Sequence, residues 1–320
     1  MDTSRPFPIS KPDLRLAMLG MVDGNGHPYS WSAIFNGYSP AEMAKCPYPV
    51  IPAYLSKQPP SAFGIDGVRV THIWTDDPED AGRVARASLI PNILERPEDA
   101  IGQVEAVVIP TDKGHEHVRR ARPFIEAGLP VFIDKPLVDN AADLRTFMAW
   151  QAEGKPILSG SCLRYAREFE PYHGSPESLG KLRLVTITTP KSWERYGIHA
   201  LEGIYPVLGP GFLTAANTGT VDRNIVHFKH AGGADAVAAA ISDLAGSFGV
   251  LGLYGTAGHA RAAFTDTFTA FKRLLEGFVR YLRTGVPPFA FSETVELARM
   301  VIAGIRSRDE AGREVALAEI

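Results

Sequence analysis

The sequence predicts an α/β protein in two parts: an N-terminal doubly wound parallel sheet, then an α+β domain with a mostly antiparallel open sheet. Three observations favour this class. The 320 residues are enough for two hydrophobic cores. In the first half, β-branched runs alternate with amphipathic stretches, which is typical of parallel strands joined by helices. In the second half, strand-like runs are separated by short turns, which favours antiparallel pairing.

The first half contains five predicted buried strands, each an apolar run between polar segments. They cover residues 14–22, 68–76, 104–112, 130–137 and 155–162. Amphipathic stretches between them predict helices, listed here with their bounds: 77–89, 114–128 and 139–154. Asp-Pro-Glu and Asp-Asn begin two of these helices, and glycines end two of them, as helix-terminus preferences predict.

A proline-rich insertion interrupts this alternation at residues 39–67, which hold six prolines. It follows a helix-compatible stretch and precedes the second strand. We expect it to cover a surface or form a subunit contact rather than take part in catalysis.

The second half begins with a strand-like run, which is followed by a helix-like stretch and then by further strand-like runs. The predicted strands are 181–192, 223–231, 234–242, 247–256 and 259–266, and the helix-like stretch is 193–209. Two amphipathic helices, 268–285 and 291–312, end the chain. We expect one domain at residues 1–138 and a second at 139–320, with the terminal helices able to pack back on the first domain.

Composition and charge exclude several classes of protein. The net charge of −3 gives no electrostatic reason to bind nucleic acid or an anionic membrane. We find no signal peptide and no apolar window long enough to span a bilayer. Cys46 and Cys162 have no metal-type spacing, and His115 and His117 do not form a zinc motif, so we expect a reduced, cytoplasmic protein without a metal.

A glycine-rich turn follows the first predicted strand. Gly20, Gly24 and Gly26 precede a helix-compatible stretch, although their spacing differs from G-x-G-x-x-G. Such a turn is weak evidence by itself, but its backbone amides and the helix N-terminus can hold a pyrophosphate. The candidate contacts in this turn are Gly20, Val22, Gly24, Asn25 and Gly26.

A lysine lies at the end of the fourth predicted strand, in the run Asp134-Lys135-Pro136. Ligands of open α/β sheets bind outside the carboxyl ends of the strands. Pro136 biases Lys135 toward extended backbone, which favours a positioned side chain. We therefore expect Lys135 to point into the ligand crevice.

Three segments resemble the glucose–fructose oxidoreductase / inositol dehydrogenase / MocA family. "EAGLPVFIDKPLVDN" is similar to its a-G-k-h-V-x-x-E-K-P motif, with Asp134 in place of the commoner Glu. "PTDKGHEH" resembles T-P-x-x-x-H, with His117 as the histidine. "YGIHALEGIYPVLG" resembles the D-x-G-x-H-x-x-D helix, where Gly197 and His199 match. With the C-terminal segment, the resemblance runs from about residue 14 to 320.

The resemblance implies a Rossmann-like NAD(P)-binding domain, a substrate-binding and oligomerisation domain, and a dehydrogenase acting on a sugar, cyclitol or related polyol. It implies that Lys135 and His199 carry the chemistry. Histidine suits removal of the hydroxyl proton, and lysine can stabilise a developing alkoxide. His27 could reach the nicotinamide or the sugar, or could cap its helix. Further implied cofactor contacts are Pro110, Thr111, His117, Asp134 and Lys135.

Two positions depart from the family pattern. Arg195 stands where the motif has its first Asp, and Glu202 where it has its second. Arg195 could instead hold a carboxylate or phosphate. Candidate substrate contacts combine aromatic faces for a sugar ring with polar groups for its hydroxyls: Arg164, Tyr165, Lys191, Trp193, Arg195, Tyr196 and His199.

The second strand ends in Thr75 and Asp76 with no arginine adjacent in the sequence, which favours NAD over NADP. Two alternatives remain open: transient oxidation during elimination or isomerisation of a sugar, and a catalytically silent nucleotide-sensing regulator. The apolar runs "LVTITT" and "VLGLYG" leave a sheet face to be covered, so we expect a homodimer or homotetramer.

Overall fold

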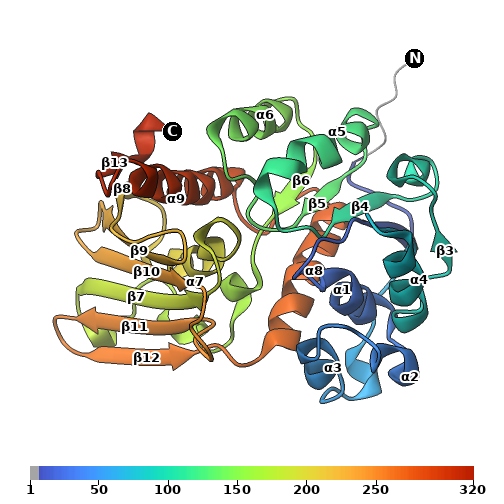
Figure 1. Ribbon diagram of the computed structural model, residues 1–320, viewed down its shortest axis with the longest axis horizontal. Coiled ribbons are helices and arrows are strands. Elements are labelled where there is room, and N and C mark those ends of the chain that lie inside the picture. The colour runs from blue at the N-terminus through green and yellow to red at the C-terminus, as the bar shows by residue number, and fades with distance from the viewer. Residues whose placement is uncertain (1–6) are drawn as a thin grey trace.

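The first sheet is parallel and six-stranded in the computed structural model, which describes residues 7–320. Its order is β3-β2-β1-β4-β5-β6. The strands are β1 (Leu14–Leu19), β2 (Val68–Trp74), β3 (Asn92–Ile93), β4 (Ala106–Ile109), β5 (Val131–Ile133) and β6 (Ile157–Ser159). The order reverses between β1 and β4, so the chain forms the crevice that binds ligands in doubly wound sheets. The predicted fold class is confirmed here (Figure 1).

Helices on this sheet begin and end near the predicted positions. They are α1 (His27–Asn36), α4 (Pro78–Ala87), α5 (His117–Glu126) and α6 (Ala141–Ala152). The Asp77 side chain accepts from the backbone N–H of Glu79, and the Asn140 side chain accepts from that of Asp143. These contacts satisfy amides that the first turn of a helix leaves unpaired, which explains why α4 and α6 begin there.

The insertion folds as α2 (Pro40–Met43), α3 (Val50–Leu55) and a 3₁₀ turn at Pro60–Ala62. Its apolar residues Met43, Ile51 and Leu55 are buried in the main core. Because these side chains enter the core, the insertion is part of the first domain rather than a loose surface arm.

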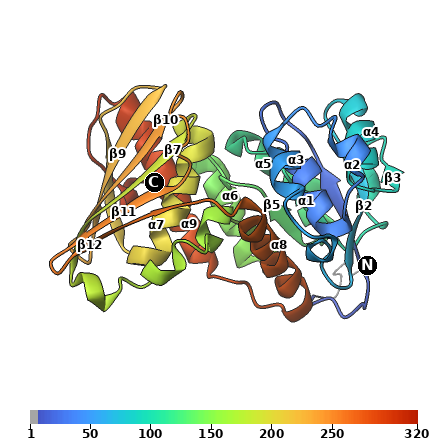
Figure 2. The same cartoon turned by 90° about the horizontal axis from the view of Figure 1, so that it is seen from below.

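The second sheet has seven strands in the order β12-β11-β7-β10-β9-β8-β13. They are β7 (Leu182–Pro190), β8 (Phe212–Asn217), β9 (Arg223–His230), β10 (Asp235–Ile241), β11 (Val250–Gly255), β12 (His259–Ala263) and β13 (Val315–Ala316). All neighbours pair antiparallel except β7 and β10. Helices α7 (Ile198–Leu208) and α9 (Phe291–Asp309) cover one face of this sheet (Figure 2).

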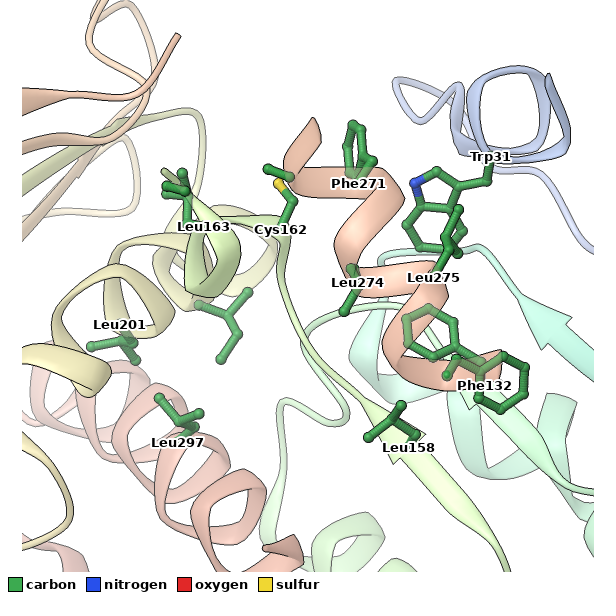
Figure 3. Packing of buried hydrophobic residues seen from close by; sticks show 14 of the residues in the cluster. Trp31, Phe132, Leu158, Cys162, Leu163, Leu201, Phe271, Leu274, Leu275 and Leu297 are labelled. Atoms are coloured by element: carbon green, nitrogen blue, oxygen red, sulfur yellow. The ribbon is translucent and has the colours of Figure 1, made fainter. Parts of the chain in front are cut away.

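Helix α8 (Thr267–Thr284) connects the two halves of the molecule. Its residues Phe271 and Leu275 lie beside Trp31 of α1 and Phe132 of β5 (Figure 3). This terminal helix therefore packs back on the first domain. The first sheet also takes in β6, which lies beyond the domain boundary predicted at residue 138. No helix within residues 7–320 has both the length and the apolar character needed to cross a membrane.

Candidate active site

Lys135 lies at the centre of the candidate site, directly after β5. Its side chain is only 2% exposed. Its Nζ lies 3.6 Å from Oδ2 of Asp112, donates to the carbonyl oxygen of Arg195 at 3.3 Å, and sits 4.7 Å from the ring centroid of Tyr196. Burial acts to lower the pKa of Lys135, but the negative charges of Asp112 and Asp134 outweigh burial and raise it. The site therefore holds a buried ammonium group.

Asp112, which follows β4, links the two domains. Arg195 donates to its Oδ1 at 2.7 Å and to the carbonyl oxygen of Asp23 in the glycine turn at 2.9 Å. Burial acts to raise the pKa of Asp112, but the charge of Lys135 and the hydrogen bond and charge of Arg195 hold it below its usual range. Sequence reasoning missed Asp112. The replacement of a motif carboxylate by Arg195 was the signal that an acid elsewhere had to pair with it.

His199 enters from the start of α7 and is 3% exposed. Its Nδ1 lies 2.6 Å from Oγ of Ser161, and the rings of Tyr196 and Phe248 lie 5.0 and 4.8 Å from its own. Burial lowers the pKa of His199 well below its ordinary value, and the positive charge of Lys135 lowers it further. His199 is therefore a neutral imidazole at pH 7.

Asp134 ties the glycine turn to the ends of β4 and β5. Its Oδ2 lies 2.6 Å from Nδ1 of His27 and accepts from Nδ2 of Asn25 at 3.2 Å. The same amide nitrogen of Asn25 donates to the carbonyl oxygen of Pro110 at 2.9 Å, and Oδ1 of Asp134 accepts from the backbone N–H of Lys135. The turn is thus held against the strand that carries Lys135.

The glycines of the turn have different structural roles. Gly20 has φ +113° and Gly24 has φ +76°, a region of backbone conformation that favours glycine. Gly26 has ordinary backbone angles, but a Cβ there would lie 2.5 Å from Cδ1 of Ile51 and 2.5 Å from the ring of Tyr48. The insertion therefore packs directly on the turn, which the sequence did not predict.

A cleft of about 650 Å³ opens between the glycine turn, the end of β2 and the insertion. Its lining residues are Met21, Val22, Asp23, Lys45, Pro47, Tyr48, Asp76, Asp77, Asp80 and Arg83. Oδ2 of Asp76 accepts from the backbone N–H of Met21 at 3.1 Å. The buried hydroxyl of Thr75 donates to the carbonyl oxygen of Asp77, so Asp76 and not Thr75 presents a polar group to the cleft.

No arginine is adjacent to Asp76 in the sequence, but one is adjacent in space. Arg120, distant in sequence, donates to Asp76 at 2.8 Å, and Arg83 lines the cleft. Arg83 is already paired with Asp80 at 2.8 Å. The acidic lining residues outnumber the cationic ones, which favours a ribose diol over a 2′-phosphate at this end of the site.

Two of the predicted site residues have structural roles instead. Trp193 is fully buried and donates to the carbonyl oxygen of Val301 at 3.0 Å. The ring nitrogens of His117 lie 2.9 and 2.8 Å from the carbonyl oxygens of Leu137 and Thr111, where they join two loops. These positions correct the predicted contact of Trp193 with substrate and of His117 with cofactor.

Arg164 and Tyr165 are engaged in contacts within the second half of the chain. Arg164 forms ion pairs with Glu202 and, at 2.7 Å, with Glu293, and Tyr165 lies against α8 near Gly277. Burial raises the pKa of Glu202 even though Arg164 acts to lower it. The ion pairs of Arg164 stabilise the second domain, and the predicted substrate contacts of Arg164 and Tyr165 stay predictions.

Lys191 and Tyr196 do reach the crevice with Arg195. Nζ of Lys191 lies 2.8 Å from the Tyr196 hydroxyl and 3.4 Å from the carbonyl oxygen of Gly24. Within residues 7–320, no group of three or more His, Cys, Asp or Glu side chains is arranged to hold a metal ion.

The parallel sheet, the glycine turn at its switch point and the strand-end lysine define a Rossmann-fold nucleotide-binding protein. Residues 50–159 match the family model described as "Oxidoreductase family, NAD-binding Rossmann fold". This match confirms the resemblance seen in the sequence over that segment, which is about a third of the chain. The glycine turn lies outside the matched segment, in keeping with its altered spacing.

One curated relative is inositol 2-dehydrogenase 1 of Saccharopolyspora erythraea, 33% identical over 113 residues, which are 34% of this chain. The match spans about a third of that relative, 32% of its length.

Solved structures share the fold across both domains. A putative myo-inositol dehydrogenase from Sinorhizobium meliloti is 17% identical and covers 95% of this chain and 99% of its own, with a TM-score of 0.73. Myo-inositol dehydrogenase from Lactobacillus casei, solved with NAD(H) and myo-inositol, is 12% identical and covers 95% and 96%, also with a TM-score of 0.73.

Proposed function

We propose that this protein is an NAD-dependent dehydrogenase that oxidises a hydroxyl carbon of a cyclitol, sugar or related polyol. The observation that supports it most is the buried ammonium of Lys135. It lies at the carboxyl edge of a nucleotide-binding sheet, with Tyr196 and His199 facing it from the second domain. A site with these groups can bind a hydroxyl, hold its oxygen and exclude water.

The residues of the first domain fit a nicotinamide dinucleotide. The backbone amides of the glycine turn and the N-terminus of α1 suit a pyrophosphate. Asp76, at the end of β2 and in the 650 Å³ cleft, suits a ribose diol. Lys191 and Arg195 contact carbonyl oxygens of the turn and bring positive charge beside it. NAD, when bound, supplies the hydride acceptor.

Lys135 is the group we assign to the substrate oxygen. Because Asp112 keeps it protonated, Lys135 can donate a hydrogen bond to that oxygen and stabilise negative charge that develops there. Asp112 acts through Lys135 and is a positioning residue. His199 approaches the same region as a neutral ring, and Arg195 holds the second domain against β4 through Asp112.

The second-domain groups favour a substrate with several hydroxyls. Hydrogen-bond donors and an aromatic face lie close together in the sequence at Lys191, Arg195 and Tyr196. Such a set suits a polyhydroxylated ring better than a short aliphatic alcohol. The inositol dehydrogenases among the comparisons are consistent with this substrate class.

The direct test follows NADH absorbance with myo-inositol, other cyclitols, aldoses and short alcohols, alongside calorimetric titrations with NAD and NADP. We expect tighter binding of NAD and turnover of a cyclitol or sugar. Equal activity on short alcohols would refute the substrate class. Exchange of substrate hydrogen without net NADH would indicate the transient-redox alternative, and NAD binding without either reaction would indicate the nucleotide-sensing alternative.

We also propose that the outer face of the second sheet joins two copies of the chain. Pairing aligns Ile225, Ala239, Thr188 and Val250 in a row across four strands on this face. Figure 2 shows α7 and α9 on the opposite face only. Leu213, Ile225 and Tyr254 are 50%, 41% and 46% exposed, so an apolar surface is left for a second copy.

A further inference from the structure

His27 and His199 have different hydrogen-bonding surroundings. We propose that His27, held by Asp134, is the proton acceptor of the reaction, and that His199 is a neutral hydrogen-bond donor to the substrate oxygen. This inference rests on the proposed dehydrogenase function. It reverses the role that the sequence motif implies for His199.

Ser161 determines which nitrogen of His199 carries hydrogen. Oγ of Ser161 already accepts from the backbone N–H of Leu163 at 3.2 Å and lies 2.6 Å from Nδ1 of His199. Because Oγ already accepts one hydrogen bond, we infer that its own proton points at Nδ1 of His199 and that Nδ1 is the acceptor. A neutral imidazole whose Nδ1 accepts carries its hydrogen on Nε2. His199 then has a donor left for substrate and no free lone pair.

Burial keeps His199 in this neutral form. The ring is 3% exposed, and the positive charges of Lys135 and Lys191 oppose a further proton on it. A second cation at this position, beside an ammonium that is already buried, is unfavourable. His199 is thus poorly suited to accept the hydroxyl proton.

His27 has the complementary arrangement. Its Nδ1 lies 2.6 Å from the ionisable carboxyl of Asp134, which can only be an acceptor when charged, so Nδ1 carries the hydrogen. Nε2 makes no hydrogen bond within residues 7–320, and the side chain stays 17% exposed. A carboxylate that fixes Nδ1–H and leaves Nε2 free is the arrangement of a general base.

The surroundings of His27 fix the orientation of its ring. Trp31 of the same helix stacks on the ring at 4.4 Å, and Phe271 of α8 meets it edge-on at 5.1 Å. The charged or titratable groups around it come from three elements: Asp134 after β5, Asp112 after β4, and His199 on α7, the last two through electrostatic interaction.

The step balances with these groups. The substrate O–H bond breaks and its proton passes to Nε2 of His27, while the C–H bond breaks and its hydride reduces the nicotinamide. The carbon–oxygen bond becomes a carbonyl, and the substrate loses two electrons. The imidazolium at His27 is offset by Asp134 and returns its proton to water through its exposed edge.

Amide variants separate a hydrogen-bond donor from a base at each position. His199→Gln keeps an N–H near Nε2 but cannot accept a proton, whereas His199→Ala removes the donor. His27→Asn keeps an N–H toward Asp134 and removes the base. The control is His115→Asn, because His115 forms an exposed His–carboxylate pair with Asp139 at 3.0 Å outside the crevice.

We expect single-turnover NADH formation, with myo-inositol as first probe, to fall about 10²–10⁴-fold in His27→Asn. It should fall about 10²–10³-fold in His199→Ala and less than about tenfold in His199→Gln. The acid limb of the pH–rate profile should disappear in His27→Asn alone. If His199→Gln is as inactive as His199→Ala and His27→Asn is near wild type, His199 is the base and the proposal fails.

Nitrogen-15 NMR of protein labelled at histidine measures which ring nitrogen of His27 and His199 carries hydrogen, and it requires no turnover. We expect a neutral His199 with hydrogen on Nε2, and hydrogen on Nδ1 of His27, with each resonance identified by loss in its variant. The opposite tautomer at His199 would overturn the proposal. Correct tautomers in a protein that oxidises no cyclitol or sugar would count against the proposed function and not against the imidazole assignment.

Discussion

Asp112 is one of the residues through which the two domains meet. Its carboxylate faces Lys135 at 3.6 Å and Arg195 at 2.7 Å, and little water reaches it. A buried lysine without a partner loses its proton readily because burial disfavours the charged form. Asp112 therefore determines whether Lys135 is an ammonium at the pH of the reaction.

Replacement of Asp112 by Asn should lower kcat and shift the alkaline limb of the kcat/KM profile to lower pH. The sign follows from Lys135, whose pKa Asp112 raises; without that charge the pKa falls and the lysine deprotonates earlier as pH rises. Loss of one partner of a buried pair should also cost about 3–5 kcal/mol of stability. If the alkaline limb of the kcat/KM profile is unchanged in Asp112→Asn, a group other than Lys135 is responsible for that limb.

Glu105 provides a pH-dependent contribution to stability far from the site. Burial acts to raise its pKa, but hydrogen bonds from Arg15 and Lys11 outweigh burial and lower it to about 2. Because the pKa of Glu105 is lower in the folded protein than in the unfolded chain, its carboxylate stabilises the fold at pH values above the unfolded-state pKa. This stabilisation is lost as the pH falls toward about 2.

Glu105→Gln should therefore lower the free energy of unfolding at pH 7 by roughly 1–3 kcal/mol, the range for hydrogen bonds to charged groups. The difference from wild type should shrink between about pH 4.5 and pH 2. Urea unfolding at several pH values measures it. A difference that stays constant with pH would contradict the role of the carboxylate charge.

Strand-end residues were predictable because their position follows from the local pattern. Lys135 and Asp134 follow a short apolar run, and the carboxyl edge of a parallel sheet is where ligands bind. Asp112 also ends a strand, but its role depends on Arg195, which is 83 residues away. The sequence predicts Trp193 as a substrate contact because an aromatic residue beside polar ones is as typical of a binding site as of a core.

At the scale of elements, the glycine turn and the insertion form one unit. Met43, Ile51 and Leu55 anchor the insertion in the core, and Tyr48 and Ile51 press against Gly26. The insertion also supplies Lys45, Pro47 and Tyr48 to the cleft. The insertion, which follows the glycine turn in the sequence, therefore helps to hold this turn of unusual spacing in place.

Gly26→Ala should destabilise the protein by about 1–3 kcal/mol and weaken NAD binding, because the added methyl group overlaps Ile51 and Tyr48. Gly82→Ala is the matched control: it lies inside α4, where the nearest atom to a Cβ is a side-chain nitrogen at 3.4 Å, and should be neutral or stabilising. If Gly26→Ala and Gly82→Ala have the same unfolding temperature and the same NAD affinity, the close packing of Ile51 and Tyr48 on Gly26 is refuted.

The long strands and helices were predictable from their periodicity, and the short ones were not. β3 has two exposed residues, and β13 has two residues near the C-terminus, so neither has a pattern of its own. β8 lacks β-branched residues apart from one threonine, and pairing with β9 makes it a strand. The contact between insertion and turn is tertiary, so no local pattern could indicate it.

For the whole molecule, the second sheet has one face covered by helices and one face open. The row from Ile225 to Val250 is apolar or small, and the neighbouring row is His227, Val237, Thr186 and Gly252. A sheet face of this kind suits a flat, self-complementary contact between two copies.

Ile225→Lys should convert the dimer to a monomer, because paired sheets would bury the added charge against its copy. Ile225 is 41% exposed, so the monomer fold should remain. Light scattering at micromolar concentration measures the mass. A wild-type protein that is already monomeric would contradict the proposed interface, as would an Ile225→Lys variant of unchanged mass.

Lys135 provides the most direct test that this fold is a dehydrogenase. The measurement is single-turnover NADH formation from the cyclitol or sugar identified by the panel, in wild type, Lys135→Met and the control Lys113→Met, whose exposed ammonium lies 3.9 Å from Glu116. We expect a loss of about 10²–10³-fold in Lys135→Met alone, with NAD affinity by calorimetry nearly unchanged. A rate in Lys135→Met close to that of wild type would contradict it.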